Sequence, residues 1–442
     1  MMNYLRNSDF QGMFSCFLLI LISAILPLSG QQNLTLQEAL AQAQNNQLYQ
    51  ARLAQIEVLK GRLEQSGKKL NPRLESEFNT AVISKEREDY EFSLVFSNTW
   101  ERGGPRELRQ QIAQIELEQA ALAAERHLRI LTSEIRLAYL ELLRLQGRID
   151  LLEDHREKVN QVLQFDQVRV QEGEIPSLNP EYLLAEVTVH AAQKGQLESQ
   201  HRLAQYRLNI LMGAPVETEH GVVEEPIQEA PLPALDQVVS FALKNRADLN
   251  SMRSSIEQAD LQINMENATG KRDWEWGVGY QYGRDTLQSD DFFPSGIIES
   301  VDSSSHRLLL NLTIPLPMGD NNSGNLTSAI AAKRVREREL AHQESVIRSE
   351  ILSAYQEYQF NQQRGKLYRQ TLVPRLQQNA QRLDAAYQLT GEDVTVWMSI
   401  QRDLMEAALQ GLEADFQLRA SVVTLEQAVG GSLEEVMQSS SP

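Results

Sequence analysis

The sequence predicts a mainly α-helical chain with a membrane β-barrel, in which one pattern of elements occurs twice. Long stretches with apolar residues at heptad spacing indicate helices that pack as coiled coils. Four runs of alternating apolar and polar residues indicate β-strands. The order of these elements recurs after an offset of about 200 residues, which indicates an internal duplication.

Composition narrows the class of protein. The 442-residue chain has 42 Lys and Arg against 60 Asp and Glu, a formal net charge of -18. This charge repels phosphate backbones, so we expect no nucleic-acid partner. Only 23 Gly and 14 Pro occur, which favours helix. The sequence holds no nucleophile motif or phosphate-binding loop, so we expect no enzyme, no catalytic residue and no cofactor.

Residues 1–30 have the order of a secretory signal peptide. Arg6 precedes the apolar run 14–28, and small residues follow before Gln31. We expect cleavage near Gly30, with an uncleaved signal anchor as the alternative. The only cysteine, Cys16, lies in this segment, so the exported chain would have no disulfide and no thiol ligand.

The first repeat, residues 31–213, begins with a helical tract that Thr35 caps and that runs to Lys69. Two alternating runs follow, each about as long as the 9 to 11 residues that a tilted strand needs to cross a bilayer. Their apolar faces carry Leu74, Ser76, Phe78, Thr80, Val82, Tyr90, Phe92, Leu94 and Phe96. Their polar faces carry the candidate tunnel-lining residues Glu75, Glu77 and Glu91.

A very long helix is predicted from Pro105 to about Gln171, followed by a turn at Gly173. At about 1.5 Å per residue this helix would be roughly 100 Å long. The returning helix, from about Glu181 to Met212, is only about half that length. The apolar seam of the long helix follows 3,4 spacing at Leu128, Leu131, Ile135, Ala138, Leu142, Leu145, Ile149 and Leu152.

The second repeat, residues 235–431, follows a proline-rich connector at 214–234 and precedes a predicted flexible tail at 432–442. Its first helix is capped by Asp236, and Pro374 predicts a bend late in its long helix. Polar hairpin loops are expected at 84–89 and 285–305. The strand faces of this repeat are apolar at Trp274, Trp276, Val278, Tyr280, Tyr282, Leu308, Leu310, Leu312 and Ile314.

The two repeats align at scattered positions. The matches pair Leu34-Thr35 with Leu235-Asp236, Leu48 with Leu249, Tyr139 with Tyr355, Gly173-Glu174 with Gly391-Glu392, and Gly213-Ala214 with Gly430-Gly431. Four strands cannot close a barrel, because a lipid-exposed edge would leave backbone groups unpaired. The sequence therefore predicts that several chains share one barrel.

These features resemble the TolC-like outer-membrane efflux proteins from Leu34 to Gly431. The resemblance rests on the order of Leu34-Thr35-Leu36-x-Glu38-Ala39-Leu40, Asn71-Pro72-Arg73, Ile314-Pro315-Leu316-Pro317 and the helix-hairpin turns at Gly173 and Gly391. The segment from Trp100 to Arg106 resembles the corresponding turn in the heavy-metal (cobalt-zinc-cadmium) efflux branch. That branch would make metal cations one candidate cargo.

The resemblance implies a homotrimer with a twelve-stranded barrel in the outer membrane and a twelve-helix tunnel in the periplasm. The chain would be the passive exit duct of a tripartite efflux system, with a periplasmic membrane-fusion adaptor and an inner-membrane efflux transporter as partners. The connector would lie in an equatorial belt. In relatives, acidic residues after the second hairpin turn help to close the periplasmic end. Here Glu392 and Asp393 take that place, and Trp397 and Glu174 are the next gate candidates.

Two further interpretations are weighed against the channel. The seven histidines do not suggest a metal site by spacing alone, since His190 and His201 would lie about 16 Å apart along one helix. A periplasmic coiled-coil adaptor or structural protein would also contain helical hairpins. An adaptor would not repeat the whole pattern twice, however, and the duplicated strands of bilayer length favour the channel.

Overall fold

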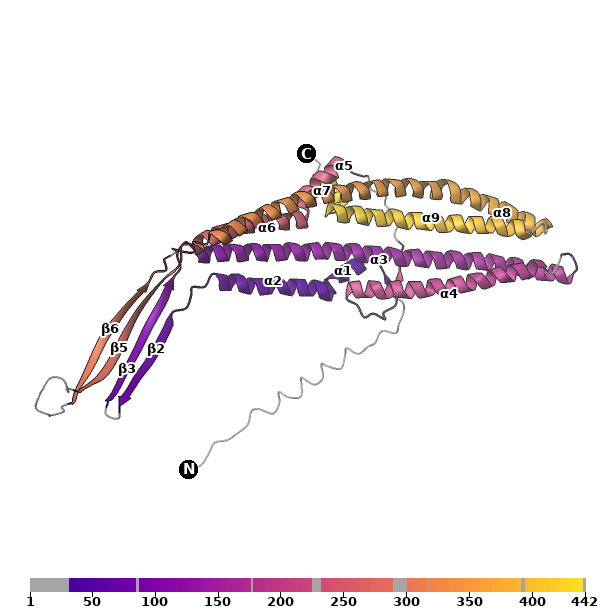
Figure 1. The fold of residues 1–442 in the computed structure, drawn as a ribbon. Coiled ribbons are helices and arrows are strands. Elements are labelled where there is room, and N and C mark those ends of the chain that lie inside the picture. Colours follow the sequence, from indigo (N-terminus) through magenta and orange to yellow (C-terminus); the bar gives the residue numbers. More distant parts are fainter. Residues whose placement is uncertain are drawn as a thin grey trace, which may run out of the picture.

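The computed structural model describes residues 32–84, 87–175, 178–224, 232–288, 300–316, 318–390 and 394–439. Figure 1 shows an elongated molecule, with a β-sheet at one end and two helical hairpins reaching the other. The predicted signal peptide lies outside the described residues.

The elements of the first half are β1 (Gln32–Leu34), α1 (Leu36–Ala41), the 3-10 turn η1 (Gln42–Asn45), α2 (Gln47–Ser66), β2 (Arg73–Ser84), β3 (Arg87–Trp100), α3 (Pro105–Gln171) and α4 (Leu178–Met212). Those of the second half are β4 (His220–Val222), α5 (Leu235–Asn245), α6 (Ala247–Thr269), β5 (Trp274–Gln288), β6 (Ser300–Thr313), α7 (Ser323–Leu367), the π-helical turn η2 (Tyr368–Leu372), α8 (Val373–Thr390), α9 (Val394–Val429) and α10 (Leu433–Ser439). Each half thus contains helices, a strand hairpin, a long helical stretch and a returning helix.

The four long strands form one antiparallel sheet in the order β2-β3-β5-β6. The second hairpin is longer than predicted, because pairing continues to Gln288 and Ser300. The polar composition suggested a loop over 285–305, but backbone pairing does not require apolar side chains. A separate two-stranded parallel sheet joins β1 to β4 in the connector.

Helix α3 is confirmed at the predicted bounds and contains 67 residues. It begins with Pro105 directly after Gly104, which has φ 72°. The predicted apolar seam from Leu131 to Leu152 is buried. It packs against α4 and α2 from its own half and against α6 and α9 from the other. In Figure 1, α2 and α4 lie end to end beside α3.

The first helix is interrupted, whereas the sequence predicts one continuous helix from Thr35 to Lys69. Asn46 ends the η1 turn, and its side-chain oxygen accepts hydrogen bonds from the backbone N–H groups of Leu48 and Tyr49 at 3.0 and 3.1 Å. Its amide nitrogen donates to the carbonyl of Leu211 at 3.0 Å. Asn46 therefore starts a new helix and holds the break against the end of α4.

An equivalent break lies between α5 and α6 in the second half. Arg246 occupies the junction and donates to the carbonyl of Ala428 at 2.5 Å, near the end of α9. The glycines that follow the two returning helices both have positive φ, 71° at Gly213 and 76° at Gly430. Gly213 faces the backbone at Asn45, and Gly430 faces Arg246. In each half the break in the first helix thus packs against the C-terminal end of the returning helix, α4 or α9.

The matched tyrosines make equivalent hydrogen bonds. The hydroxyl of Tyr139 lies 2.8 Å from the carbonyl oxygen of Leu34, just before α1. The hydroxyl of Tyr355 lies 3.2 Å from the carbonyl oxygen of Pro233, just before α5. Both tyrosines tie the start of their own half to its long helix, which supports the duplication.

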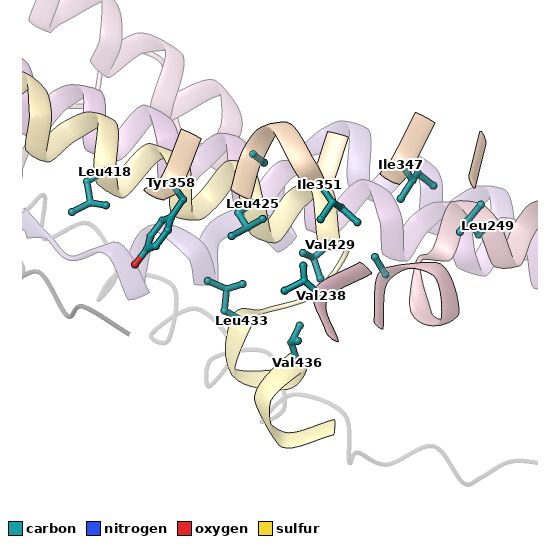
Figure 2. Close-up of a cluster of buried hydrophobic side chains, with 12 residues drawn as sticks. Val238, Leu249, Ile347, Ile351, Tyr358, Leu418, Leu425, Val429, Leu433 and Val436 are labelled. Carbon is teal, nitrogen blue, oxygen red and sulfur yellow. The ribbon is translucent and has the colours of Figure 1, made fainter. Parts of the chain in front are cut away.

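The C-terminal segment contains a short helix where the sequence predicts a flexible tail over 432–442. Residues 433–439 form α10, and Leu433 and Val436 are buried. Figure 2 shows these two side chains in a cluster with Val238 of α5, Ile351 of α7 and others from α9. The segment is mostly polar, which favoured a tail. Leu433 and Val436, however, are three residues apart and therefore share one face of a helix.

The long helical stretch of the second half is divided at the π-helical turn η2, and Pro374 is the second residue of α8. A proline removes one backbone donor, and π-turns alter the hydrogen-bond ladder. Figure 1 shows α7 and α8 following one curved path, as the sequence predicts.

Among the described residues, the helices include none with the length and apolar character needed to span a bilayer.

Candidate functional site

The four-stranded sheet has one continuous apolar face. The pairing places Leu74 opposite Phe96, Val278 opposite Leu310, and Trp276 opposite Leu312. Leu310 is 75% exposed and Leu74 is 66% exposed. The apolar face comprises Leu74, Phe78, Phe92, Leu94, Phe96, Trp276, Val278, Tyr280, Leu308, Leu310 and Leu312, all of them exposed. A contiguous exposed apolar surface of this kind marks contact with a membrane or another protein.

The opposite face of the sheet is polar and contains the three predicted lining residues. Glu75 and Glu77 alternate with the apolar positions of β2, and Glu91 pairs with Asn79 in the register of β3. An oxygen of Glu91 lies 4.0 Å from a guanidinium nitrogen of Arg307 on β6. The sheet therefore places these acidic side chains together on one face, as the sequence predicts.

The two outer strands of the sheet are open along one edge. Strands β2 and β6 contain 12 and 14 residues, and each pairs with only one other strand in the described part of the chain. Open edges of this length present rows of backbone donors and acceptors that another chain can pair with.

The far end of the helical body contains Trp397, one of the four gate candidates. Trp397 is only 2% exposed and packs with Leu183 and Met398. Its indole N–H donates to Oδ1 of Asp384 at 2.7 Å, and the side-chain amide of Gln401 donates to the same oxygen at 2.7 Å. Within a single chain, Trp397 is therefore a hydrogen-bonded core residue.

The other gate candidates occupy different surroundings. Glu174 is exposed in the turn after α3 and accepts a hydrogen bond from Nε of Arg169 at 3.0 Å. Glu392 and Asp393 lie outside the described residues. The structure therefore places Glu174 on the surface and Trp397 in the core.

Sequence reasoning missed a buried acid at this end. Asp166 of α3 is fully buried, and the hydroxyl of Tyr387 on α8 donates to its two carboxylate oxygens at 2.9 and 2.8 Å. Burial raises the pKa of Asp166, although the hydrogen bond from Tyr387 opposes that shift. The pair connects the two halves of the chain. The sequence signal for this pair was that Asp166, a polar residue, falls on the continuation of the 3,4-spaced apolar seam of α3.

A second polar group lies on the same seam. His155 of α3 meets Glu186 and His190 of α4, and one ligand-type atom from each lies within 4.8 Å of the others. By spacing alone the sequence predicts no metal-ligating group, because His190 and His201 lie about 16 Å apart along one helix. The structure supplies a partner from the neighbouring helix instead, because α3 and α4 are antiparallel and in contact.

We expect Tyr387→Phe to destabilise the chain by about 1 to 3 kcal/mol at neutral pH, since it removes a donor to a buried carboxylate. A raised folded-state pKa means that the contribution of Asp166 to stability is present at acid pH and is lost as pH rises through that pKa. The variant raises this pKa further, so its deficit should be larger at pH 7 than at acid pH. Thermal unfolding at both pH values measures this.

The matched control is Tyr206→Phe, because Tyr206 is 38% exposed. It should change stability little at either pH. An equal deficit for Tyr387→Phe at both pH values would show that Asp166 is not charged in the folded chain.

Comparison with known proteins gives a family match over the second half of the chain. Residues 238–431 match the sequence model of the outer membrane efflux protein family. The second repeat matches the outer membrane efflux proteins. No curated protein matches the chain by sequence.

Solved structures show a likeness in fold over nearly the whole chain. CusC, in structures of its transmembrane channel formation, has a TM-score of 0.73 at 14% identity, covering 92% of this chain and 96% of that one. The outer membrane protein VceC of Vibrio cholerae gives 0.68 at 17%, covering 90% and 96%. The CmeC outer membrane channel of Campylobacter jejuni gives 0.67 at 14%, covering 91% and 88%. At these identities the likeness shows the fold, which is that of outer membrane channels.

Proposed function

We propose that this protein is one protomer of an outer membrane channel that acts as the passive exit duct of a tripartite efflux system. The observation that carries the proposal is the sheet: it has an exposed apolar face, an acidic opposite face and two open edges. It stands at one end of a helical body whose longest helix has 67 residues, roughly 100 Å.

A trimer satisfies the open edges of the sheet. Edge-to-edge pairing of β6 with β2 of the next protomer would join three sheets into a twelve-stranded barrel in the outer membrane. The apolar face would then meet lipid, and Glu75, Glu77 and Glu91 would line the lumen. Closure removes every edge, which a lipid-exposed sheet requires.

The helical body would form the periplasmic extension. Three copies would place their hairpins around one axis as a twelve-helix tunnel, with the connector at 214–234 in an equatorial belt. Residues 1–30 would act as the signal peptide for export. The partners would be a periplasmic membrane-fusion adaptor and an inner-membrane efflux transporter. Metal cations are one candidate cargo, through the resemblance of the segment from Trp100 to Arg106.

Fractionation of cells tests this proposal. We expect a heat-modifiable trimer in the outer membrane fraction. A soluble monomer would refute the channel and favour the alternative, a periplasmic coiled-coil adaptor or structural protein.

We expect Glu392→Gln combined with Asp393→Asn to lower cation selectivity and to weaken block by multivalent cations. Three copies of two carboxylates in a narrow constriction attract cations more strongly than the same charges in bulk water. Single-channel recordings in planar bilayers measure both properties.

The matched control is Glu217→Gln, a neutralised exposed carboxylate in the connector, away from both hairpin turns. The trimer should stay intact in both variants. Unchanged selectivity and block in the double variant would assign the gate elsewhere, with Trp397 and Glu174 as the next positions to examine.

A further inference from the structure

Three potential metal ligands meet between α3 and α4. Glu186 and His190 are one helical turn apart on α4, and His155 faces them from α3. His155 is 5% exposed and His190 is 4% exposed. The imidazole ring centroids are 4.8 Å apart, with the rings inclined edge to face at 71°. In Figure 1 the two helices lie side by side along this length.

The separation between His190 and Glu186 fits a bound cation better than a hydrogen bond. Nε2 of His190 lies 3.4 Å from Oε1 of Glu186. A hydrogen bond between such atoms is usually about 2.7 to 3.2 Å long. In a tetrahedral zinc site with bonds of about 2.0 to 2.1 Å, two ligand atoms lie about 3.3 Å apart. This ligand pair is therefore already at metal-binding separation.

The imidazoles also have unused polar atoms. Nε2 of His155 and Nδ1 of His190 are buried and have no hydrogen-bond partner. Leaving a buried polar atom unpaired is unfavourable, and native structures contain few such atoms. Two unpartnered ring nitrogens in one buried cluster that also contains a carboxylate point to a ligand.

The three groups are surrounded by buried packing and by Arg402. Burial, helped by the neighbouring His190, lowers the pKa of His155 to about 4. Burial also lowers the pKa of His190. Arg402 of α9 donates to both oxygens of Glu186, at 3.0 and 2.6 Å, and lowers the pKa of that carboxyl.

We propose that His155, Glu186 and His190 bind a divalent transition-metal cation of the Zn²⁺ type. Two imidazoles and one carboxylate are a ligand set that suits Zn²⁺ and leaves one position open. Ca²⁺ and Mg²⁺ prefer oxygen ligands, so this set selects against them. The cation would join the two helices of the first hairpin. Through Glu186, which Arg402 also binds, it would connect that hairpin to α9. This inference is independent of the proposed channel function.

The test uses the full-length purified protein, stripped of metal and titrated with ZnCl₂ by calorimetry. We expect one Zn²⁺ per chain in the unaltered protein. His155→Ala and His190→Ala should each weaken binding by at least about tenfold, since each removes one ligand. The matched control is His201→Ala, which lies on the same helix outside the cluster and should bind as the unaltered protein does. Circular dichroism checks that each variant is folded.

Co²⁺ provides a measurement that needs no variant. Bound in this site, it should give the intense visible absorption of a four-coordinate ion, and Zn²⁺ should displace it. Failure of the unaltered protein to bind Zn²⁺ would overturn the proposal. The proposal would also be overturned if folded His155→Ala and His190→Ala each bound Zn²⁺ as tightly as the unaltered protein does. The weak visible spectrum of six-coordinate Co²⁺ would overturn it too.

Discussion

Replacing Trp276 or Leu310 by aspartate is expected to impair membrane insertion and trimer assembly. Both side chains belong to the exposed apolar face of the sheet, where they are 40% and 75% exposed. A Lys or Arg on such a face at the bilayer midplane costs about 2 to 4 kcal/mol, and an acid costs less. A trimer would contain three copies of each substitution. The measurement is the fraction of heat-modifiable trimer in outer membranes.

The matched control for these substitutions is Glu75→Gln, on the polar face of the same sheet. Its assembly should be normal, because in the proposed channel this side chain faces an aqueous lumen, which tolerates a neutral polar group. If Trp276→Asp and Leu310→Asp both assemble like the unaltered protein, the assignment of the apolar face to lipid is wrong.

Gly213→Ala is expected to destabilise the chain strongly, by about 3 kcal/mol or more, from backbone strain and overpacking together. Gly213 has φ 71°, in the left-handed region that favours glycine. A Cβ there would lie 2.5 Å from the carbonyl oxygen of Asn45 and 2.7 Å from its carbon. These are backbone atoms at the break between α1 and α2, so no side-chain movement relieves the clash. Denaturant unfolding followed by circular dichroism measures the loss.

Gly173→Ala separates the two causes. Gly173 has a similar φ of 77°, but a Cβ there would meet no atom within 4 Å. Its substitution should therefore cost only the backbone strain, about 1 to 2 kcal/mol. Equal losses for Gly173→Ala and Gly213→Ala would mean that the close approach to Asn45 contributes nothing.

The duplication is partly visible in the sequence and partly only in the structure. Matches such as Tyr139 with Tyr355 are sparse in the sequence, yet both hydroxyls contact the segment before the first helix of their half. The helix breaks at Asn46 and Arg246 were not predicted. Neither residue type rules out a continuous helix. The hydrogen bonds of Asn46 and Arg246 to the ends of α4 and α9 form only in the folded chain, so the sequence does not reveal them.

The candidate sites divide in the same way. The acidic face of the sheet was predicted, because period-two alternation assigns each residue to a face without knowledge of its neighbours. Asp166 and His155 were missed, because their partners Tyr387, Glu186 and His190 come from other helices. A polar residue on an apolar seam signals only that some partner is required.

The sequence alone determined the long helix α3, its buried seam, the faces of the four strands and the order of elements in each half. These properties depend on spacing along the chain, which local periodicity encodes directly. Only the tertiary structure decided where the first helices break, how α10 packs, and which polar side chains meet at the far end. Those outcomes depend on which helices are neighbours and on their axial offset. Packing over the whole length of the body sets that offset, and no short stretch of sequence specifies it.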